Sequence, residues 1–291
     1  MAPPRRVRQA LSDVVLVLAQ PRMRQISPRM AFERASERAF IGVSALLFAA
    51  SAAVTITWCA SMSAMGEMSM PGSRTLSMTW MRTSGQTWPG AAASFVGMWV
   101  VMMVAMMLPS LLPTLWRYRR AVESAGEERL GGLTVLVGTG YFFVWMLFGV
   151  VVFSIGVALA AVEMQLPALA RAVPFAIGVV VLVAGALQCS AWKAHHLACC
   201  RATPGRDQTL SAKAGAAWRH GLRLGLHCSF SSSGLTTILL IVGLMNLRAM
   251  AVVTAAITVE RLAPEGERVA RVIGAVVIGA GLFLIARAVL E

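Results

Sequence analysis

The sequence contains little charge of either sign and few acidic groups. Only 13% of its 291 residues are charged, whereas an ordinary soluble domain has roughly 25%. Hydrophobic residues make up 57% of the chain, and its mean hydropathy is +0.71. Apolar runs of about 20 residues recur, and at ~1.5 Å per residue each can cross the ~30 Å hydrocarbon core of a bilayer. The composition therefore predicts an all-α fold, a polytopic bundle of transmembrane helices.

The sequence also lacks the short motifs of several enzyme classes. It contains no C-x-x-C, no G-x-x-x-x-G-K and no H-E-x-x-H. The apolar runs hold too few polar residues to assemble a Ser/His/Asp triad. Hydrolase and ATPase activities have no support, and a protein without enzymatic activity is favoured. The five cysteines lie in or beside apolar runs, which argues against a secreted disulfide framework and favours roles as ligands or core residues.

The basic residues are distributed as topology signals. The net charge of +13 comes from short segments between apolar runs, so it does not indicate a nucleic-acid-binding surface. Eight arginines lie in residues 1–38, which we expect to be a basic cytoplasmic tail that touches anionic lipid. Of the 26 Lys and Arg residues, 21 fall on the side of the tail. This bias predicts a bacterial inner-membrane protein with a cytoplasmic N-terminus.

Residues 39–291 are predicted to form the transmembrane helical domain. The expected spans are 40–60, 91–115, 133–162, 173–196, 224–245, 249–260 and 272–290. Seven crossings put the C-terminus outside. If the short segment 249–260 does not cross, six spans remain and the C-terminus lies inside.

Methionines gather in two places. The predicted outer loop, residues 61–90, carries four closely spaced candidate ligands: Met62, Met65, Met68 and Met70. Thioether sulfur is a soft donor, so such spacing favours capture of Cu(I), although a plain linker stays open. The second span contains M-W-V-V-M-M-V-A-M-M-L-P-S, which places all five of its methionines, Met98 included, on one broad helical face. Four of them are candidate metal ligands and are called the methionine face: Met102, Met103, Met106 and Met107. This face either lines a path for metal or packs as core.

Cysteine and histidine side chains gather near the predicted inner ends of the later spans. The candidate metal ligands there are Cys189, His195, His196, Cys199, Cys200, His227, Cys228 and Glu260. On one continuous helix, Cys189, His196 and Cys200 share a face with Lys193. Imidazole and thiolate groups are ligands of soft and borderline metals. In the alternative without a metal site, Lys193 only extends its charged end to the membrane interface, and Glu260 only pairs with Lys193 or Arg261.

With these segments in view, the chain resembles a bacterial family of predicted metal-binding integral membrane proteins whose function is unknown. The resemblance covers residues 99–275. It depends on the methionine segment together with G-Y-F-F-V-W, A-L-Q-C-S-A-W-K-A-H-H-L-A-C-C-R, G-L-M-N-L-R-A-M and Glu260. The matching positions are Trp99, Met102, Met103, Met106, Met107, Pro109, Gln188, Lys193, Cys200, Cys228, Met245, Asn246 and Glu260. Where the family carries a cysteine-rich stretch, this chain has H-C-S-F-S-S-S, so the resemblance implies a metal site there that is weakened or rebuilt with His227.

The sequence therefore predicts a membrane protein that handles or transfers a soft metal ion such as Cu(I). Its expected surroundings are the lipid bilayer and a partner membrane or periplasmic metalloprotein, without nucleic acid. Two alternatives stay open. One is an accessory or assembly subunit of a membrane complex that holds no metal, and the other is a copper-dependent membrane oxidoreductase.

Overall fold

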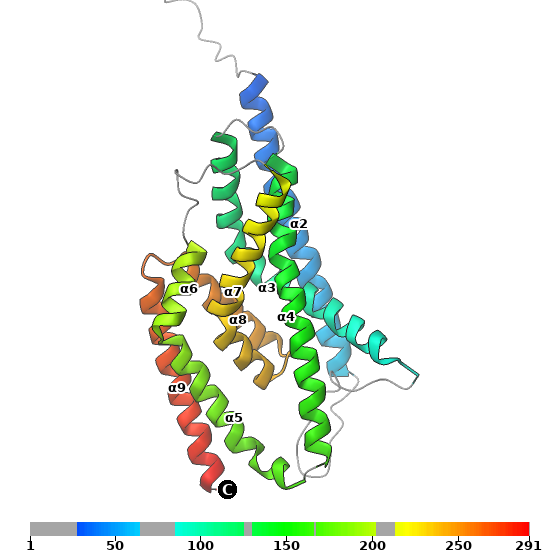
Figure 1. Cartoon of the computed structure of the whole chain (residues 1–291), viewed down its shortest axis with the longest axis vertical. Coiled ribbons are helices and arrows are strands. Elements are labelled where there is room, and N and C mark those ends of the chain that lie inside the picture. Colours follow the sequence, from blue (N-terminus) through cyan, green and yellow to red (C-terminus); the bar gives the residue numbers. More distant parts are fainter. Residues whose placement is uncertain (1–27, 65–84, 125–129, 166, 202–212, 291) are drawn as a thin grey trace, which may run out of the picture. The chain divides into compact units, whose positions relative to one another are not determined.

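The computed structural model describes residues 28–64, 85–124, 130–165, 167–201 and 213–290, and every regular element in these ranges is an α-helix. By its internal contacts the chain divides into two units, Met1–Val43 and Ser44–Glu291. The helices are α2 (Pro28–Ala64), α3 (Trp88–Ser124), α4 (Leu130–Gln165), α5 (Pro167–Gln188), α6 (Ala191–Arg201), α7 (Ala214–Val242), α8 (Leu247–Leu262) and α9 (Gly266–Leu290) (Figure 1). Helices suit this sequence because they satisfy every backbone polar group within the segment, as a bilayer requires.

The predicted class, an all-helical membrane protein, is confirmed. Within the described residues, five helices are long and apolar enough to cross a membrane, and α5 with α6 counts as a sixth if that bent pair is one span. With the bent pair counted, the number is one short of the seven spans expected, and the missing span is α8. With 16 residues, α8 extends only ~24 Å, which is less than the ~30 Å hydrocarbon core. The first span, Ala35–Ser61, lies within a helix that already begins at Pro28, inside the segment predicted as a tail.

A break divides the expected span 173–196 into α5 and α6, whose axes meet at 57°. The backbone N–H groups of Cys189 and Ser190 close a tight turn by donating to the carbonyls of Ala186 and Leu187, each at 3.1 Å. The Ser190 hydroxyl then accepts the backbone N–H of Lys193 at 3.2 Å and caps α6. The expectation that Cys189 shares a helical face with His196 and Cys200 is therefore wrong, because no continuous helix joins them.

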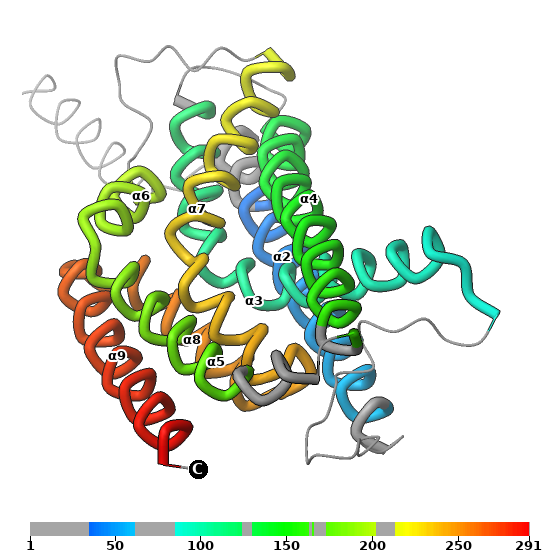
Figure 2. Tube along the Cα trace, turned by 60° about the horizontal axis from the view of Figure 1, so that its bottom comes forward, coloured from blue at the N-terminus to red at the C-terminus, as the bar shows by residue number. Residues whose placement is uncertain are grey.

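Small residues allow two pairs of helices to approach closely. Between α5 and α9, a Cβ on Gly281 would lie 2.7 Å from the backbone nitrogen of Leu182, and Figure 2 shows the two helices side by side. Between α4 and α7, a Cβ on Gly221 would collide with the carbonyl of Val137. Close backbone contact of this kind is typical of helix packing in membranes. It brings Tyr141 of α4, one turn beyond Val137, against α7.

Candidate metal centre

A buried polar group joins α5, α6 and α8. Lys193 Nζ lies 2.7 Å from Glu260 Oε2 and donates to Gln188 Oε1 at 2.9 Å, while Gln188 Nε2 donates to the second oxygen of Glu260. Lys193 and Glu260 are 3% and 2% exposed. The ion pair therefore neutralises both charges, and the Gln188 amide forms a hydrogen bond with each of the two charged groups. Of the two partners expected for Glu260, Lys193 is the one that forms the ion pair.

Cys228 is the centre of a second buried contact, which joins four helices. Its Sγ lies 2.7 Å from the hydroxyl of Tyr141 on α4 and 2.5 Å from Nη2 of Arg261 on α8. Arg261 also donates through Nη1 to Ser110 Oγ of α3 at 3.1 Å. Cys228 and Tyr141 are fully buried. Cys228 lies midway along α7, because this helix begins at Ala214, ten residues before the start of the expected span.

Cys200 lies next to this centre. Its Sγ is 3.9 Å from the hydroxyl of Ser231, which in turn donates to the carbonyl of Cys228 at 3.0 Å. Cys200 is 4% exposed. The helical pairing of α6 with α7 thus places two of the predicted cysteines in one buried region.

The histidines form a separate group toward the surface of α6 and α7. His196 Nδ1 and His227 Nδ1 are 2.9 Å apart, a hydrogen-bond distance. One metal bound by both nitrogens at ~2.0 Å would hold them ~3.3 Å apart at tetrahedral corners and ~3.5 Å apart at trigonal corners, so the rings must separate before they share an ion. His195 Nε2 and Cys199 Sγ lie 3.7 Å apart on consecutive turns of α6, which is the spacing two ligands of one ion require.

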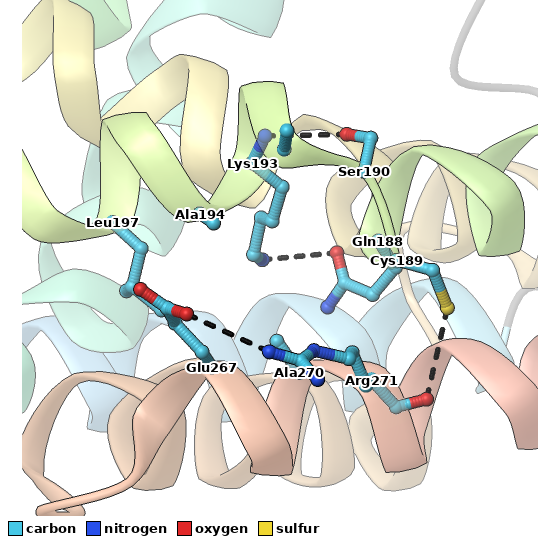
Figure 3. A pocket seen from close by; sticks show the side chains of 10 residues that line it. Gln188, Cys189, Ser190, Lys193, Ala194, Leu197, Glu267, Ala270 and Arg271 are labelled. Atoms are coloured by element: carbon cyan, nitrogen blue, oxygen red, sulfur yellow. Dashed lines mark hydrogen bonds and ion pairs between the residues drawn. The ribbon is translucent and has the colours of Figure 1, made fainter.

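Cys189 lines a cleft of about 450 Å³ at the break between α5 and α6 (Figure 3). Its exposed thiol is directed toward the carbonyl of Arg271 on α9, at 3.7 Å. Lys193 also lines the cleft, as do Glu267 and Arg271 of α9, which form an ion pair. Cys189 is therefore separated from the buried environment of Cys200 and Cys228.

The predicted methionine face of α3 is buried in the protein and does not face lipid. Met102, Met103, Met106 and Met107 are each at most 3% exposed, and α3 packs on α4 and α8. The face ends at the Cys228 centre, because the Ser110 hydroxyl donates to the carbonyl of Met107 at 3.0 Å and accepts from Arg261. At its other end, Trp99 packs into the gap left by Gly149 of α4.

No three His, Cys, Asp or Glu side chains converge on a single metal position in the part of the chain that the structure describes. The predicted ligands form pairs instead, and their role as ligands stays a prediction. Met65, Met68 and Met70 lie outside the described residues. Met62 falls within α2, but its side chain is also outside them.

Sequence reasoning missed three members of the Cys228 centre: Ser110, Tyr141 and the guanidinium of Arg261 as a partner of sulfur. Arg261 was considered only as a possible partner of Glu260. A signal was present, since an arginine in the last turn of an apolar segment needs a partner. Its identity depends on how α3, α4, α7 and α8 pack together.

Together, the apolar helices and the buried sulfur donors define a membrane-associated protein with chemistry suited to a soft metal. The chain belongs to the PpoB2 copper chaperone family, whose family model matches residues 96–284. This match supports the predicted relation to copper and covers all four residues of the Cys228 centre, Ser110, Tyr141, Cys228 and Arg261. No curated protein and no solved structure matches the chain.

Proposed function

We propose that this protein is a membrane copper chaperone that binds Cu(I) at Cys228 and Cys200 and passes it along the methionine face of α3. The observation that carries the proposal is the placement of the buried Cys228 thiol at the end of that face, linked to it through Ser110 and Arg261. Thiolate and thioether sulfur are the donors that select Cu(I). Copper is the cargo in this account.

Arg261 supports the proposal through its charge. Its guanidinium donates to Cys228 Sγ at 2.5 Å, a hydrogen bond strengthened by the charge of the donor. The same guanidinium lies where a cation bound to Cys228 would have to approach. We therefore assign Arg261 as a positioning residue that holds the sulfur by a hydrogen bond before copper arrives and moves aside when copper binds.

The surface group gives the ion a second place to stop. His195 and Cys199 already lie at ligand spacing, and His196 and His227 reach it after a movement of less than about 1 Å. In this proposal, these four residues exchange copper between the buried cysteines and a partner metalloprotein. On the other side of the membrane, Met62, Met65, Met68 and Met70 collect the ion.

The proposal is tested by copper content per chain, measured alongside unfolding in detergent. Replacement of Met102 and Met106 together by Leu conserves volume, so each change should cost less than about 1.5 kcal/mol of stability. Because the soft donors are gone, copper recovered with the protein should fall to the level of the Cys200→Ser/Cys228→Ser variant. Met250→Leu, at a buried position of α8 outside the methionine face, is the matched control.

Two results would contradict the proposal. Unchanged copper in the Met variant with depleted copper in the Cys variant leaves a buried site without a methionine path. Unchanged copper in both variants assigns these residues to packing. The second outcome favours the alternative function, a subunit that supports assembly of a membrane complex, for which the complete burial of the methionine face is the favouring observation.

The proposed direction of handling depends on topology, with a cytoplasmic N-terminus. Reporter fusions after Gln20 and at Gly205 should be cytoplasmic, and one at Gly72 should be periplasmic, because of the bias in basic residues. A fusion at the C-terminus separates the two models of α8. A cytoplasmic signal there means six crossings and a non-spanning α8, whereas a periplasmic signal means seven.

A further inference from the structure

Two sulfur atoms meet at the end of α2 and the turn between α7 and α8. Cys59 Sγ lies 3.8 Å from Met245 Sδ, although the residues are 186 positions apart in the chain. Cys59 is 3% exposed, and Met245 is half-buried. Neither residue is among the donors of the proposed chaperone path. A thiol and a thioether held together in this way combine the two softest donors that proteins offer.

The turn that carries Met245 is held by a series of hydrogen bonds. Gly243 adopts a φ of 114°, which other residues rarely reach, and its N–H donates to the carbonyl of Leu239 at 3.0 Å. Asn246 donates its N–H to the carbonyl of Gly243 at 3.1 Å and caps α8 by accepting from Ala249 N–H at the same distance. Met245 is thus held between two fixed neighbours and does not need to be ordered when a ligand binds.

The distance between the two sulfurs fits one shared ion. At a metal–sulfur bond of ~2.3 Å, two sulfurs at trigonal corners lie ~4.0 Å apart, and at tetrahedral corners ~3.8 Å. The observed 3.8 Å requires almost no movement. In contrast, the imidazole nitrogens of His196 and His227 must first separate.

We propose that Cys59 and Met245 form a second Cu(I) site, distinct from Cys228. The inference rests on the proposed function in that copper is the ion handled. When Cu(I) binds, Cys59 Sγ releases its proton to solvent or buffer and forms a sulfur–copper bond, while Met245 Sδ donates a lone pair. No electron is transferred. Only two protein donors are used, so a third position stays open for the donor that brings or removes the ion.

The position of this pair gives it a role in the path. Met245 precedes the first turn of α8, and Arg261 lies in its last turn, so the sulfur pair and the Cys228 centre lie at opposite ends of this helix. The 14 helical steps from Leu247 to Arg261 separate the two ends by ~21 Å. The methionine face lies on α3, which packs against α8. The pair is therefore the loading site at the far end of the proposed path.

The test is a Cu(I) titration of the full-length protein in detergent under reducing conditions, in competition with a chelator specific for Cu(I). The starting variant is Cys200→Ser/Cys228→Ser, which removes the buried inner site. We expect it to bind one copper ion fewer than the wild-type chain. Addition of either Cys59→Ser or Met245→Leu should remove one further ion. Met245→Leu keeps the side-chain volume, so its protein should fold even if Cys59→Ser does not.

Met250→Leu, five residues further along the chain, is the control and should leave the copper number of the starting variant unchanged. If both Cys59→Ser and Met245→Leu also leave it unchanged, the second site is refuted while the chaperone proposal stands. If Cys200→Ser/Cys228→Ser binds as much copper as the wild type but the Cys59 and Met245 variants each lose one ion, the second site stands and the inner site fails.

Discussion

Glu260 and Arg261 are neighbours in the chain, yet the end of α8 uses their charges in opposite ways. Glu260 is enclosed by Lys193 and Gln188, which satisfy both of its oxygens with fixed partners. Arg261 is partly buried, and its partners are a hydroxyl and a thiol, Ser110 and Cys228. A carboxylate that is paired with an ammonium group would not be stabilised by exchange of this partner for a soft cation. A thiol, in contrast, can replace its guanidinium partner with a soft cation. One helix end thus combines a fixed structural tie with an exchangeable contact.

Removal of Lys193 should have the largest effect, because it leaves the Glu260 charge buried without its partner. We expect Lys193→Met to lower the free energy of unfolding by about 3–5 kcal/mol, measured by denaturation in detergent. The double variant Lys193→Met/Glu260→Leu should recover much of this loss, since no unpaired charge remains. The exposed pair Arg268 and Glu265 is the control, and its loss should cost below about 1 kcal/mol. Equal losses of unfolding free energy at the buried and the exposed ion pair would show that the Lys193–Glu260 pair has no special role in stability.

Replacement of Arg261 should change copper binding more than stability. In Arg261→Gln, an incoming Cu(I) no longer displaces a charge-assisted hydrogen bond from Cys228, so its affinity should rise about tenfold, or ~1.4 kcal/mol. Arg261→Lys keeps the charge near the sulfur and should bind copper as the wild type does. Chelator competition measures both. A lower affinity in Arg261→Gln would mean that the guanidinium assists copper binding and does not compete with the ion for the sulfur.

The smallest effect is expected at the hydroxyl of Tyr141. Tyr141→Phe removes one hydrogen bond to Cys228 while the ring stays in place, so the cost should be about 0.5–1.5 kcal/mol. Copper per chain should not change, because the sulfur is intact. Loss of copper in this variant would instead identify the phenol oxygen as part of the metal site.

Sequence periodicity predicted the fold well because membrane helices depend mainly on local composition. It predicted the helices that surround the Cys228 centre. The burial of the methionine face in α3 follows from the helical spacing of its methionines. The break after Gln188 was not predicted, since the apolar run continues through it and only Ser190 signals a cap. The partner of Cys228 was not predictable either. Arg261 reaches this thiol only because α7 and α8 pack against α3, and residue spacing along one helix does not contain that information.

The close approach of α4 and α7 also limits how the centre can move. Val137 and Gly221 touch through their backbones, so one helix cannot slide past the other without driving a side chain into a carbonyl. Tyr141 and Cys228 therefore lie on two helices that are held in place against each other. The movable part is the guanidinium of Arg261, which reaches these two helices from α8 on a long, flexible side chain. A change of the Arg261 rotamer alone would thus uncover the Cys228 sulfur, without any rearrangement of the helices.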